Sequence, residues 1–291
     1  MSMESSAMPR QVTVIGAGTM GNGIAQVFAT FGVSTVLCDV SDAAVQRGVD
    51  AIGKSLDRFV KKATMTEEQK AAILGRVKTS TKIESAVGES DLMVEAVFEN
   101  LEVKLDIFRR ADGAAPKDAI LASNTSSISI TKLAAGTKRP SQVIGMHFMN
   151  PVPLMKLVEV ICGNDTSSST TDAVLRIARG LDKIPVAAQD YPGFISNRVL
   201  MPMINEAAFC LMEGVATREG IDEIMKLGMN HPMGPLTLAD FIGLDVCVNI
   251  LDVLKDGLGD DKYRACPLLR RMVAAGHLGR KTGRGFYEYT K

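Results

Sequence analysis

The sequence predicts an α/β protein with two domains: a doubly wound, mostly parallel sheet wrapped by helices, and an all-α domain after it. Short β-branched runs alternate with helical patterns along the first part of the chain, an order typical of such sheets. Strand signals nearly stop after Asp190. The length of 291 residues also favours two domains, since one domain takes roughly 150 residues. We therefore expect domains over residues 1–189 and 190–291.

The first elements predict a β-α-β unit. Residues 11–15 are short and β-branched, residues 23–31 have helical spacing, and residues 34–39 are again strand-like. Residues 41–76 are charged and helical, and the run TEEQ within them has the pattern of a capping box. We predict that these residues form two helices that extend away from the sheet, and we call this pair the helical excursion.

Four further apolar runs are predicted as strands, and four later segments as helices. The predicted strands are residues 91–97, 119–123, 143–148 and 156–161. The predicted helices are residues 194–214, 217–228, 236–255 and 267–276. The sheet thus belongs to the first domain, and the second domain is helical.

The composition argues against several classes of function. Lysine plus arginine equals aspartate plus glutamate at 33 each, so no global positive field would collect nucleic acid or an anionic membrane. The five cysteines never form a C-x-x-C pair, which favours a reducing compartment and no metal site. No signal region or apolar run of roughly 18 residues is present. We expect a cytoplasmic protein, with the peroxisome and the mitochondrial matrix as alternatives.

A glycine-rich loop lies between the first strand and the first helix. In such a unit Gly16 permits a tight turn, Gly18 lets the backbone approach a pyrophosphate, and Gly21 lets the helix pack close to the strand. Thr19 and Met20 open the helix, whose N-terminus would face the phosphates. Taken alone, the glycine pattern is weak evidence for dinucleotide binding, because methyltransferases use similar loops.

Asp39 strengthens the prediction of a Rossmann-type NAD site. It ends the second predicted strand, 18 residues after Gly21, where a carboxylate accepts both ribose hydroxyls and repels a 2′-phosphate. The alternative is a cap or turn residue before Ser41. Loop, helix and acid together favour dinucleotide binding, with NAD rather than NADP as the cofactor.

One histidine and one glutamate are candidates for proton transfer. His147 should lie at the carboxyl end of a strand, where open α/β sheets bind ligands. In the predicted strand MKLVEVI, Glu159 projects from an otherwise apolar row, and such a carboxylate needs a partner. A histidine held by a carboxylate has its tautomer fixed and its imidazolium stabilised. A lone histidine is more often structural, and we assign His231 and His277 to that class.

Four longer motifs carry a resemblance to a known family. They are SNTSSISI, GMHFMNPVPLMKLVEV, DYPGFISNRVLMPMINEA and LGRKTGRGFYEY. With these motifs in one colinear order from about Val12 to Tyr289, the sequence closely resembles the 3-hydroxyacyl-CoA dehydrogenase family, and within it the short-chain 3-hydroxybutyryl-CoA dehydrogenases. The family pattern HFFNP is HFMNP here. Since methionine is a flexible apolar filler, we expect Met149 to alter the acyl pocket slightly.

The resemblance implies catalytic roles for four residues. His147 would be the general acid/base and Glu159 would orient and charge it. This suits alcohol oxidation, because the hydroxyl proton must leave as the hydride goes to nicotinamide. Ser126 and Asn197 would hold the C3 oxygen near the histidine. By pattern alone, Ser126 is a turn residue, and Asn197 fits equally well a buried amide that caps local backbone.

The resemblance also extends the NAD site and adds a coenzyme A site. Beyond the glycine loop and Asp39, it implies NAD contacts at Glu99, Lys104, Ser126, Asn150 and Lys281. It implies coenzyme A contacts at Ser55 and Lys62 in the helical excursion, and a lysine near phosphates is electrostatically sensible. By pattern alone, Glu99 and Lys104 are solvated helix charges, and KSLDRFVKK is a charged surface.

The resemblance, together with the predicted NAD site, implies an NAD-dependent enzyme that interconverts (S)-3-hydroxyacyl-CoA and 3-oxoacyl-CoA, with 3-hydroxybutyryl-CoA as the expected substrate. The resemblance further implies a homodimer formed through the C-terminal domain. Two alternatives stay open: an NAD-linked dehydrogenase of free sugar acids, as among the lens-crystallin relatives, and a non-catalytic NAD-binding protein. The presence of all four predicted catalytic residues favours an enzyme.

Overall fold

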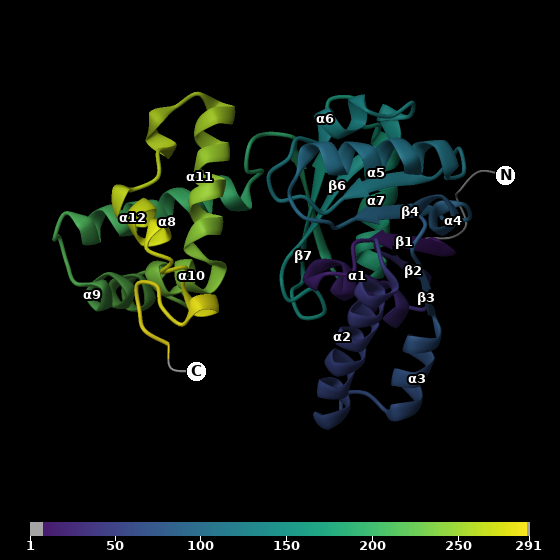
Figure 1. Ribbon diagram of the computed structural model, residues 1–291, viewed down its shortest axis with the longest axis horizontal. Helices are drawn as coiled ribbons and strands as arrows, with labels where there is room; N and C mark the ends of the chain where they lie inside the picture. The colour runs from purple at the N-terminus through teal and green to yellow at the C-terminus, as the bar shows by residue number, and fades with distance from the viewer. Residues whose placement is uncertain (1–7, 290–291) are drawn as a thin grey trace. The chain divides into compact units, whose positions relative to one another are not determined.

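The protein forms two compact units, divided between Asp190 and Tyr191. The computed structural model describes residues 8–289. Within them, the first unit is an eight-stranded sheet wrapped by helices, and the second unit consists of helices and short turns (Figure 1). The predicted fold class, a Rossmann-type α/β domain followed by an all-α domain, is confirmed.

The sheet has the strand order β3-β2-β1-β4-β5-β6-β7-β8. Its strands are β1 (Gln11–Ile15), β2 (Ser34–Cys38), β3 (Val77–Ser80), β4 (Leu92–Glu95), β5 (Ile120–Ser123), β6 (Val143–Phe148), β7 (Leu157–Cys162) and β8 (Ile184–Gln189). Neighbours pair in parallel except β6 and β7, which are antiparallel. The first six strands follow the order of doubly wound dinucleotide-binding sheets.

Helices connect the strands of the first unit and make up most of the second. In the first unit they are α1 (Thr19–Thr30), α2 (Asp42–Lys61), α3 (Glu67–Gly75), α4 (Ile83–Val87), α5 (Leu101–Ala114), α6 (Ile130–Ala135) and α7 (Ser168–Gly180). In the second they are α8 (Ser196–Met212), α9 (Arg218–Glu223), α10 (Pro235–Ile242), α11 (Leu244–Leu258) and α12 (Pro267–Ala274).

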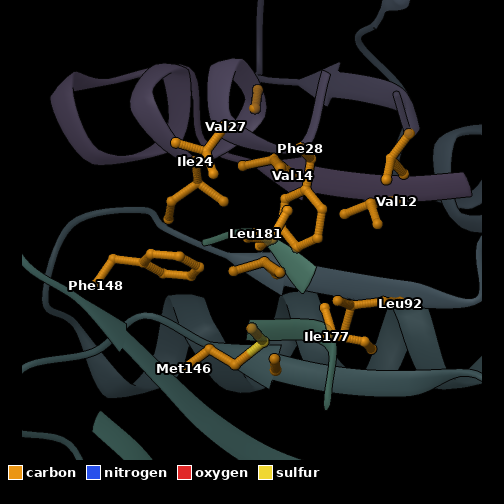
Figure 2. Close-up of a cluster of buried hydrophobic side chains, with 14 of the residues drawn as sticks. Val12, Val14, Ile24, Val27, Phe28, Leu92, Met146, Phe148, Ile177 and Leu181 are labelled. Atoms are coloured by element: carbon orange, nitrogen blue, oxygen red, sulfur yellow. The ribbon is translucent and has the colours of Figure 1, made fainter. Parts of the chain in front are cut away.

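The core of the first unit lies where α1 packs on the middle of the sheet (Figure 2). Val12 and Val14 of β1 are fully buried, as are Ile24 and Phe28 of α1. Met146 of β6 belongs to the same cluster. Because both faces of a central parallel strand are covered, β1 is buried from Val12 to Ile15, and Thr13 is accommodated there by a hydrogen bond from its hydroxyl to the Ala86 carbonyl.

The helical excursion consists of two helices, as predicted. Helix α3 begins with a reciprocal capping box between Thr66 and Gln69. Lys70 of α3 contacts Asp57 of α2, with 2.5 Å between Nζ and Oδ1, so an ion pair joins the two helices. Figure 1 shows the pair extending away from the sheet.

Two strands and one helix break were not predicted. Strand β3 contains two exposed residues of four, and β8 contains Pro185 and exposed positions, so neither shows the apolar run of a buried strand. The single helix predicted over residues 236–255 is wrong. Gly243 has φ of 106° and separates α10 from α11, because this positive φ cannot continue a right-handed helix.

The cysteines are all free thiols. Burial raises the pKa of Cys38 to about 11 and that of Cys247 to about 12, so these thiols stay protonated at neutral pH. Among residues 8–289, no three His, Cys, Asp or Glu side chains gather in a way that could hold a metal ion. None of the helices in this range is long and apolar enough to cross a membrane.

Candidate active site

His147 and Glu159 lie directly opposite each other in the β6–β7 pair. His147 is next to last in β6, and Glu159 is third in β7. Because β7 is antiparallel to β6, the start of β7 lies beside the carboxyl end of β6. A residue from the beginning of one strand is thereby brought to the edge of the sheet where ligands bind.

The two side chains form a short hydrogen bond inside the protein. Nδ1 of His147 and Oε2 of Glu159 are 2.7 Å apart, and the residues are 7% and 3% exposed. An ionised carboxylate can only accept, so Nδ1 donates and the ring tautomer is fixed. The other nitrogen, Nε2, is then the one that can take up or release a proton.

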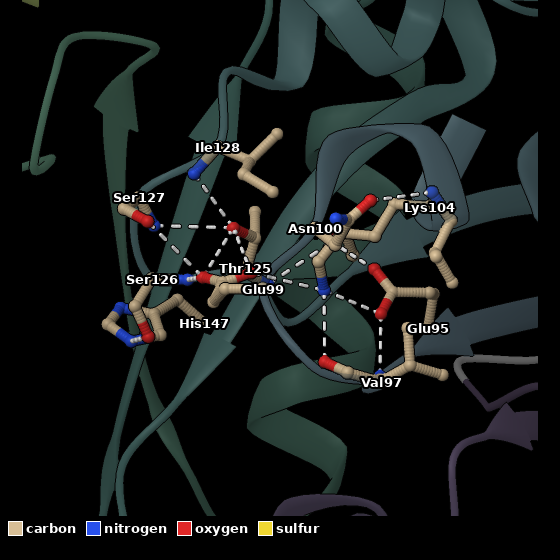
Figure 3. Close-up of polar contacts among 12 residues, drawn as sticks. Glu95, Val97, Glu99, Asn100, Lys104, Thr125, Ser126, Ser127, Ile128 and His147 are labelled. Atoms are coloured by element: carbon tan, nitrogen blue, oxygen red, sulfur yellow. Dashed lines mark hydrogen bonds and ion pairs between the residues drawn. The ribbon is translucent and has the colours of Figure 1, made fainter. Parts of the chain in front are cut away.

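Ser126 faces that second nitrogen. It lies in the loop after β5, and its Oγ is 3.2 Å from Nε2 of His147 (Figure 3). Asn124, in the same loop, accepts a hydrogen bond of 2.9 Å from the backbone N–H of Phe148, which ties the loop to β6. The structure therefore brings together three of the predicted catalytic residues: His147, Glu159 and Ser126.

Glu99 and Lys104 differ in their surroundings. Lys104 is 1% exposed, so the pattern-based prediction of a solvated charge is wrong for it. Its Nζ lies 2.6 Å from Oε1 of the buried Glu95 and 3.2 Å from Oε2 of Glu99. Glu99 is partly exposed and accepts a 2.6 Å hydrogen bond from the Ser126 backbone N–H. The loops after β4 and β5 are thus joined through Glu99, whose carboxylate contacts both the buried Lys104 and the Ser126 backbone N–H (Figure 3).

The three loop glycines serve different steric needs. Gly16 has φ of 102°, and a Cβ there would lie 2.6 Å from the carbonyl oxygen of Ala96. A Cβ on Gly21 would lie 1.7 Å from the carbonyl oxygen of Gly16, so α1 packs on β1 only with glycine here. A Cβ on Gly18 would meet nothing within 4 Å. Space beside Gly18 and close packing at Gly21 are what a pyrophosphate-binding loop requires.

Asp39 borders a cleft at the same end of α1. Its carboxylate accepts hydrogen bonds of 2.7 Å from the backbone N–H groups of Ala17 and Val40. Residues that line the cleft include Gly18, Thr19, Asn22, Asp39 and Arg47. The α1 N-terminus has no side-chain cap, so its backbone donors fit a phosphate group. Together these features fit the dinucleotide that the sequence predicts.

Ser55 and Lys62 line one hollow on the surface of the first unit. Arg58 and Phe59 from α2 line it as well, together with Pro151, Pro153 and Leu154 from the segment between β6 and β7. Residues 55, 58, 59 and 62 share one face, because they are spaced by three or four. Two cations and a hydroxyl beside an apolar wall can bind an anionic group attached to an apolar one.

The other predicted site residues are placed as follows. Asn150 is exposed and Met149 half-buried at the end of β6. Asn197 belongs to the second unit, where it is 8% exposed in the first turn of α8. Lys281, also in the second unit, is exposed and lies 2.6 Å from Asp245 in an ion pair. The contacts predicted for these residues stay predictions.

Two family models cover almost the whole chain. The model for the NAD binding domain of 3-hydroxyacyl-CoA dehydrogenase matches residues 11–191. The model for the C-terminal domain of 3-hydroxyacyl-CoA dehydrogenase matches residues 193–289. The chain belongs to the 3-hydroxyacyl-CoA dehydrogenase family. The resemblance inferred from the four motifs is thereby confirmed.

Individual members of this family are similar over their full length. The chain is 56% identical over 276 residues to a probable 3-hydroxybutyryl-CoA dehydrogenase of Deinococcus radiodurans, which covers 95% of this chain and 99% of that protein. It is 53% identical over 280 residues to one of Bacillus subtilis, covering 96% and 97%. The crystal structure of (S)-3-hydroxybutyryl-CoA dehydrogenase from Ralstonia eutropha matches with a TM-score of 0.94 and 53% identity, covering 97% and 99%.

The sequence analysis did not predict two charged residues of the candidate site, Glu95 and Arg58. Glu95 ends the apolar run DLMV, and a carboxylate at the end of a buried strand is a signal that could have been used. Arg58 lies three residues from Ser55 and four from Lys62, so helical spacing could have grouped them. In the sequence, neither residue differs from the exposed charged residues around it.

The glycine loop permits a test that separates packing from ligand binding. Gly21→Ala should lower the free energy of unfolding by at least about 1–3 kcal/mol, because its Cβ collides with backbone. Gly18→Ala should unfold like the wild type but bind NADH roughly ten-fold more weakly, about 1.4 kcal/mol, because its Cβ enters the space left for the pyrophosphate. Thermal unfolding and NADH fluorescence titration measure the two effects. Gly53→Ala in α2 is the control, and undiminished NADH binding by Gly18→Ala would contradict the assignment.

Proposed function

We propose that the protein catalyses the NAD-dependent interconversion of (S)-3-hydroxyacyl-CoA and 3-oxoacyl-CoA, with 3-hydroxybutyryl-CoA as its substrate. The observation that carries this proposal is the orientation of His147, whose Nδ1 is 2.7 Å from Glu159 and whose Nε2 faces Ser126. Relatives that are 53% and 56% identical bear the name probable 3-hydroxybutyryl-CoA dehydrogenase. The name and the orientation of the histidine support the same reaction.

His147 moves the proton in this reaction. During oxidation its Nε2 takes the proton of the C3 hydroxyl, and in the reverse direction it returns that proton to the C3 oxygen. Glu159 stabilises the imidazolium formed at His147, because the negative charge lies 2.7 Å from Nδ1. Bound NAD supplies the hydride acceptor, so that the proton and the hydride of the alcohol leave to different groups.

Ser126 and Asn197 hold the C3 oxygen. A serine hydroxyl both donates and accepts, so Ser126 Oγ, 3.2 Å from Nε2, can donate to the substrate oxygen beside the histidine. Asn197 adds an amide donor to the same oxygen. Two donors aimed at an oxygen that gains negative charge favour reduction of a carbonyl.

The cofactor is NAD, held by the glycine loop with Thr19 and Met20, by Asp39, and by further contacts to Glu99, Lys104, Ser126, Asn150 and Lys281. Asp39 excludes NADP, because its charge repels a 2′-phosphate. Arg47 lines the same cleft and would attract a 2′-phosphate, so the preference for NAD requires that the repulsion by Asp39 outweighs this attraction. Ser55 and Lys62 hold the coenzyme A moiety, and Met149 shapes the acyl pocket.

The decisive test of the function is an assay with acetoacetyl-CoA. The wild type should oxidise NADH much faster than NADPH. His147→Gln should lower the turnover number by roughly 10²- to 10⁴-fold, the usual contribution of a general acid/base, and leave NADH binding intact. His231→Gln is the matched control and should turn over like the wild type. Equal rates for His147→Gln and the wild type would overturn the assignment.

Lys62 tests whether the substrate is a coenzyme A thioester. Lys62→Ala should raise the KM for acetoacetyl-CoA roughly ten-fold or more, because a hydrogen bond to a charged group contributes about 1.5–3 kcal/mol. The turnover number should change little, and the effect should shrink at high salt. Lys54→Ala, on the same helix but outside the hollow, is the control. If acetoacetyl-CoA is not reduced while free hydroxy acids are oxidised, the sugar-acid alternative replaces this proposal.

We further propose that residues 1–189 carry the cofactor and the proton-transfer residues, and that residues 190–291 form a homodimer in the cytoplasm. Val199 of α8 is 68% exposed, Leu227 is 82% exposed, and Met229 is 60% exposed, so the second unit has apolar surface for a partner.

Val199→Glu should therefore yield a monomer. Sedimentation of the wild type as a monomer at working concentration would contradict the dimer and leave the chemistry untouched.

A further inference from the structure

Lys183 is a buried lysine in the short connection between α7 and β8, with 7% of the residue exposed. Its Nζ donates a hydrogen bond of 2.6 Å to the carbonyl oxygen of Val152 and one of 2.7 Å to that of Met155. Asp182, the carboxylate next to it in the sequence, pairs with Lys156 instead. Burying a charge is costly unless it is hydrogen-bonded, so the position of this ammonium depends on the two carbonyls.

Both carbonyls belong to one turn, residues 151–155, between β6 and β7. The N–H groups of Leu154 and Met155 both donate to the carbonyl oxygen of Pro151, each over 3.0 Å, and these bonds close the turn. The carbonyls of Val152 and Met155 converge on Lys183. An ammonium has three N–H donors, so one lysine can satisfy two buried carbonyls that would be costly to leave unpaired.

The turn is also fixed to two neighbouring elements. Val152 is 2% exposed and packs on α1, where a Cβ on Gly23 would lie only 2.9 Å from the Val152 Cβ. After the turn, the carbonyl of Lys156 accepts a 2.8 Å hydrogen bond from the N–H of Ile184, the first residue of β8. The turn therefore lies between α1 and the start of β8, and Lys183 links its beginning to its end.

The side chains of the same turn form a wall of the surface hollow on the first unit. Pro151, Pro153 and Leu154 line this hollow together with Ser55 and Lys62 of α2. Leu154 is 61% exposed, so its own packing does little to fix it. A wall that moves in the free protein must be ordered when a ligand binds, and that ordering weakens binding. A turn that hydrogen bonds already hold avoids this loss.

We propose that Lys183 is a positioning residue for coenzyme A: it holds the 151–155 turn in one shape, so that Pro151, Pro153 and Leu154 form a preorganised wall of the hollow. Lys183 acts through the turn. This inference deepens the proposed function and rests on it for the identity of the ligand. The shape of the turn is a property of the protein without ligands, so one test of it needs no assay of activity.

The variant Lys183→Met removes the ammonium and keeps a side chain of similar length. In the protein without ligands, hydrogen exchange of the Leu154 and Met155 N–H groups, followed by NMR, should become at least roughly ten-fold faster, because the turn opens more often. The Phe148 N–H, which Asn124 holds, should exchange as in the wild type. Unchanged exchange in the turn, or equal acceleration of all three amides, would overturn the inference.

Kinetics separate positioning of the hollow from a general loss of stability. With acetoacetyl-CoA and saturating NADH, Lys183→Met should raise the KM roughly ten-fold, because the wall must now be ordered on binding. The turnover number should change little, since the wall contacts the substrate far from the reacting carbons. A lower turnover number with an unchanged KM would overturn the inference. Lys117→Met, at an exposed lysine of the same unit, is the matched control.

A truncated substrate locates the effect. The acetoacetyl thioester of N-acetylcysteamine keeps the reacting carbons and lacks the nucleotide of coenzyme A. For this substrate, kcat/KM should be the same for Lys183→Met and the wild type, because the binding energy of the hollow is not used. An equal loss of kcat/KM with both substrates would show that Lys183 does not act through the hollow, and would overturn the inference.

Two checks keep the result interpretable. If Lys183→Met unfolds, Lys183→Gln keeps N–H donors on a shorter side chain and should raise the KM for acetoacetyl-CoA by a smaller factor; an unchanged KM would overturn the inference. If the wild type does not reduce acetoacetyl-CoA, the proposed function has failed, and calorimetric titration with free coenzyme A decides the inference. The wild type should bind it roughly ten-fold more tightly than the variant, and equal affinities or no binding by the wild type would overturn the inference.

Discussion

The hydrogen bond between Glu159 and His147 depends on one reversal of direction in an otherwise parallel sheet. In parallel strands, the residues at the ligand-binding edge come only from strand ends. By running antiparallel to β6, β7 brings Glu159 from its own beginning to the same edge. Both partners lie on paired strands, so their relation is set by the sheet's hydrogen bonds rather than by a loop.

The loops around this pair are held by side-chain oxygens that accept hydrogen bonds from backbone N–H groups. Asn124 ties the loop after β5 to Phe148, and Glu99 ties the same loop to the one after β4. Each group accepts backbone N–H donors that would otherwise be unsatisfied, and such groups are costly to bury unpaired. Rigid strands with loops joined by hydrogen bonds give the preorganised geometry that proton transfer requires.

The sequence predicted the features whose chemistry is local. The glycine loop and Asp39 could each be identified from neighbours within one strand or turn, and His147 and Glu159 from two strands that follow each other in the sequence. Features that depend on distant residues could not. Lys104 can be buried only because Glu95 from another element pairs with it. The residues around Lys104 in the sequence have the pattern of an exposed helix, so they do not indicate that it is buried.

The fold was predicted with the same limits. Central strands such as β1 and β6 are buried on both sides and are therefore rich in β-branched and other apolar residues. The edge strands β3 and β8 are partly exposed, so their sequences resemble loops. The break at Gly243 could not be predicted, because a glycine inside a helical pattern can either continue the helix or end it with a positive φ. Only the tertiary structure selects the positive φ seen here.

The most direct test of the central claim is the protonation state of His147. The protein has three histidines, so ¹⁵N NMR of histidine-labelled protein can resolve them, with the spectrum of His147→Gln assigning the signal. In the neutral ring, the proton should be on Nδ1, towards Glu159, with Nε2 unprotonated and able to accept a proton. A neutral ring protonated on Nε2 would contradict this, because that nitrogen could not then serve as the base.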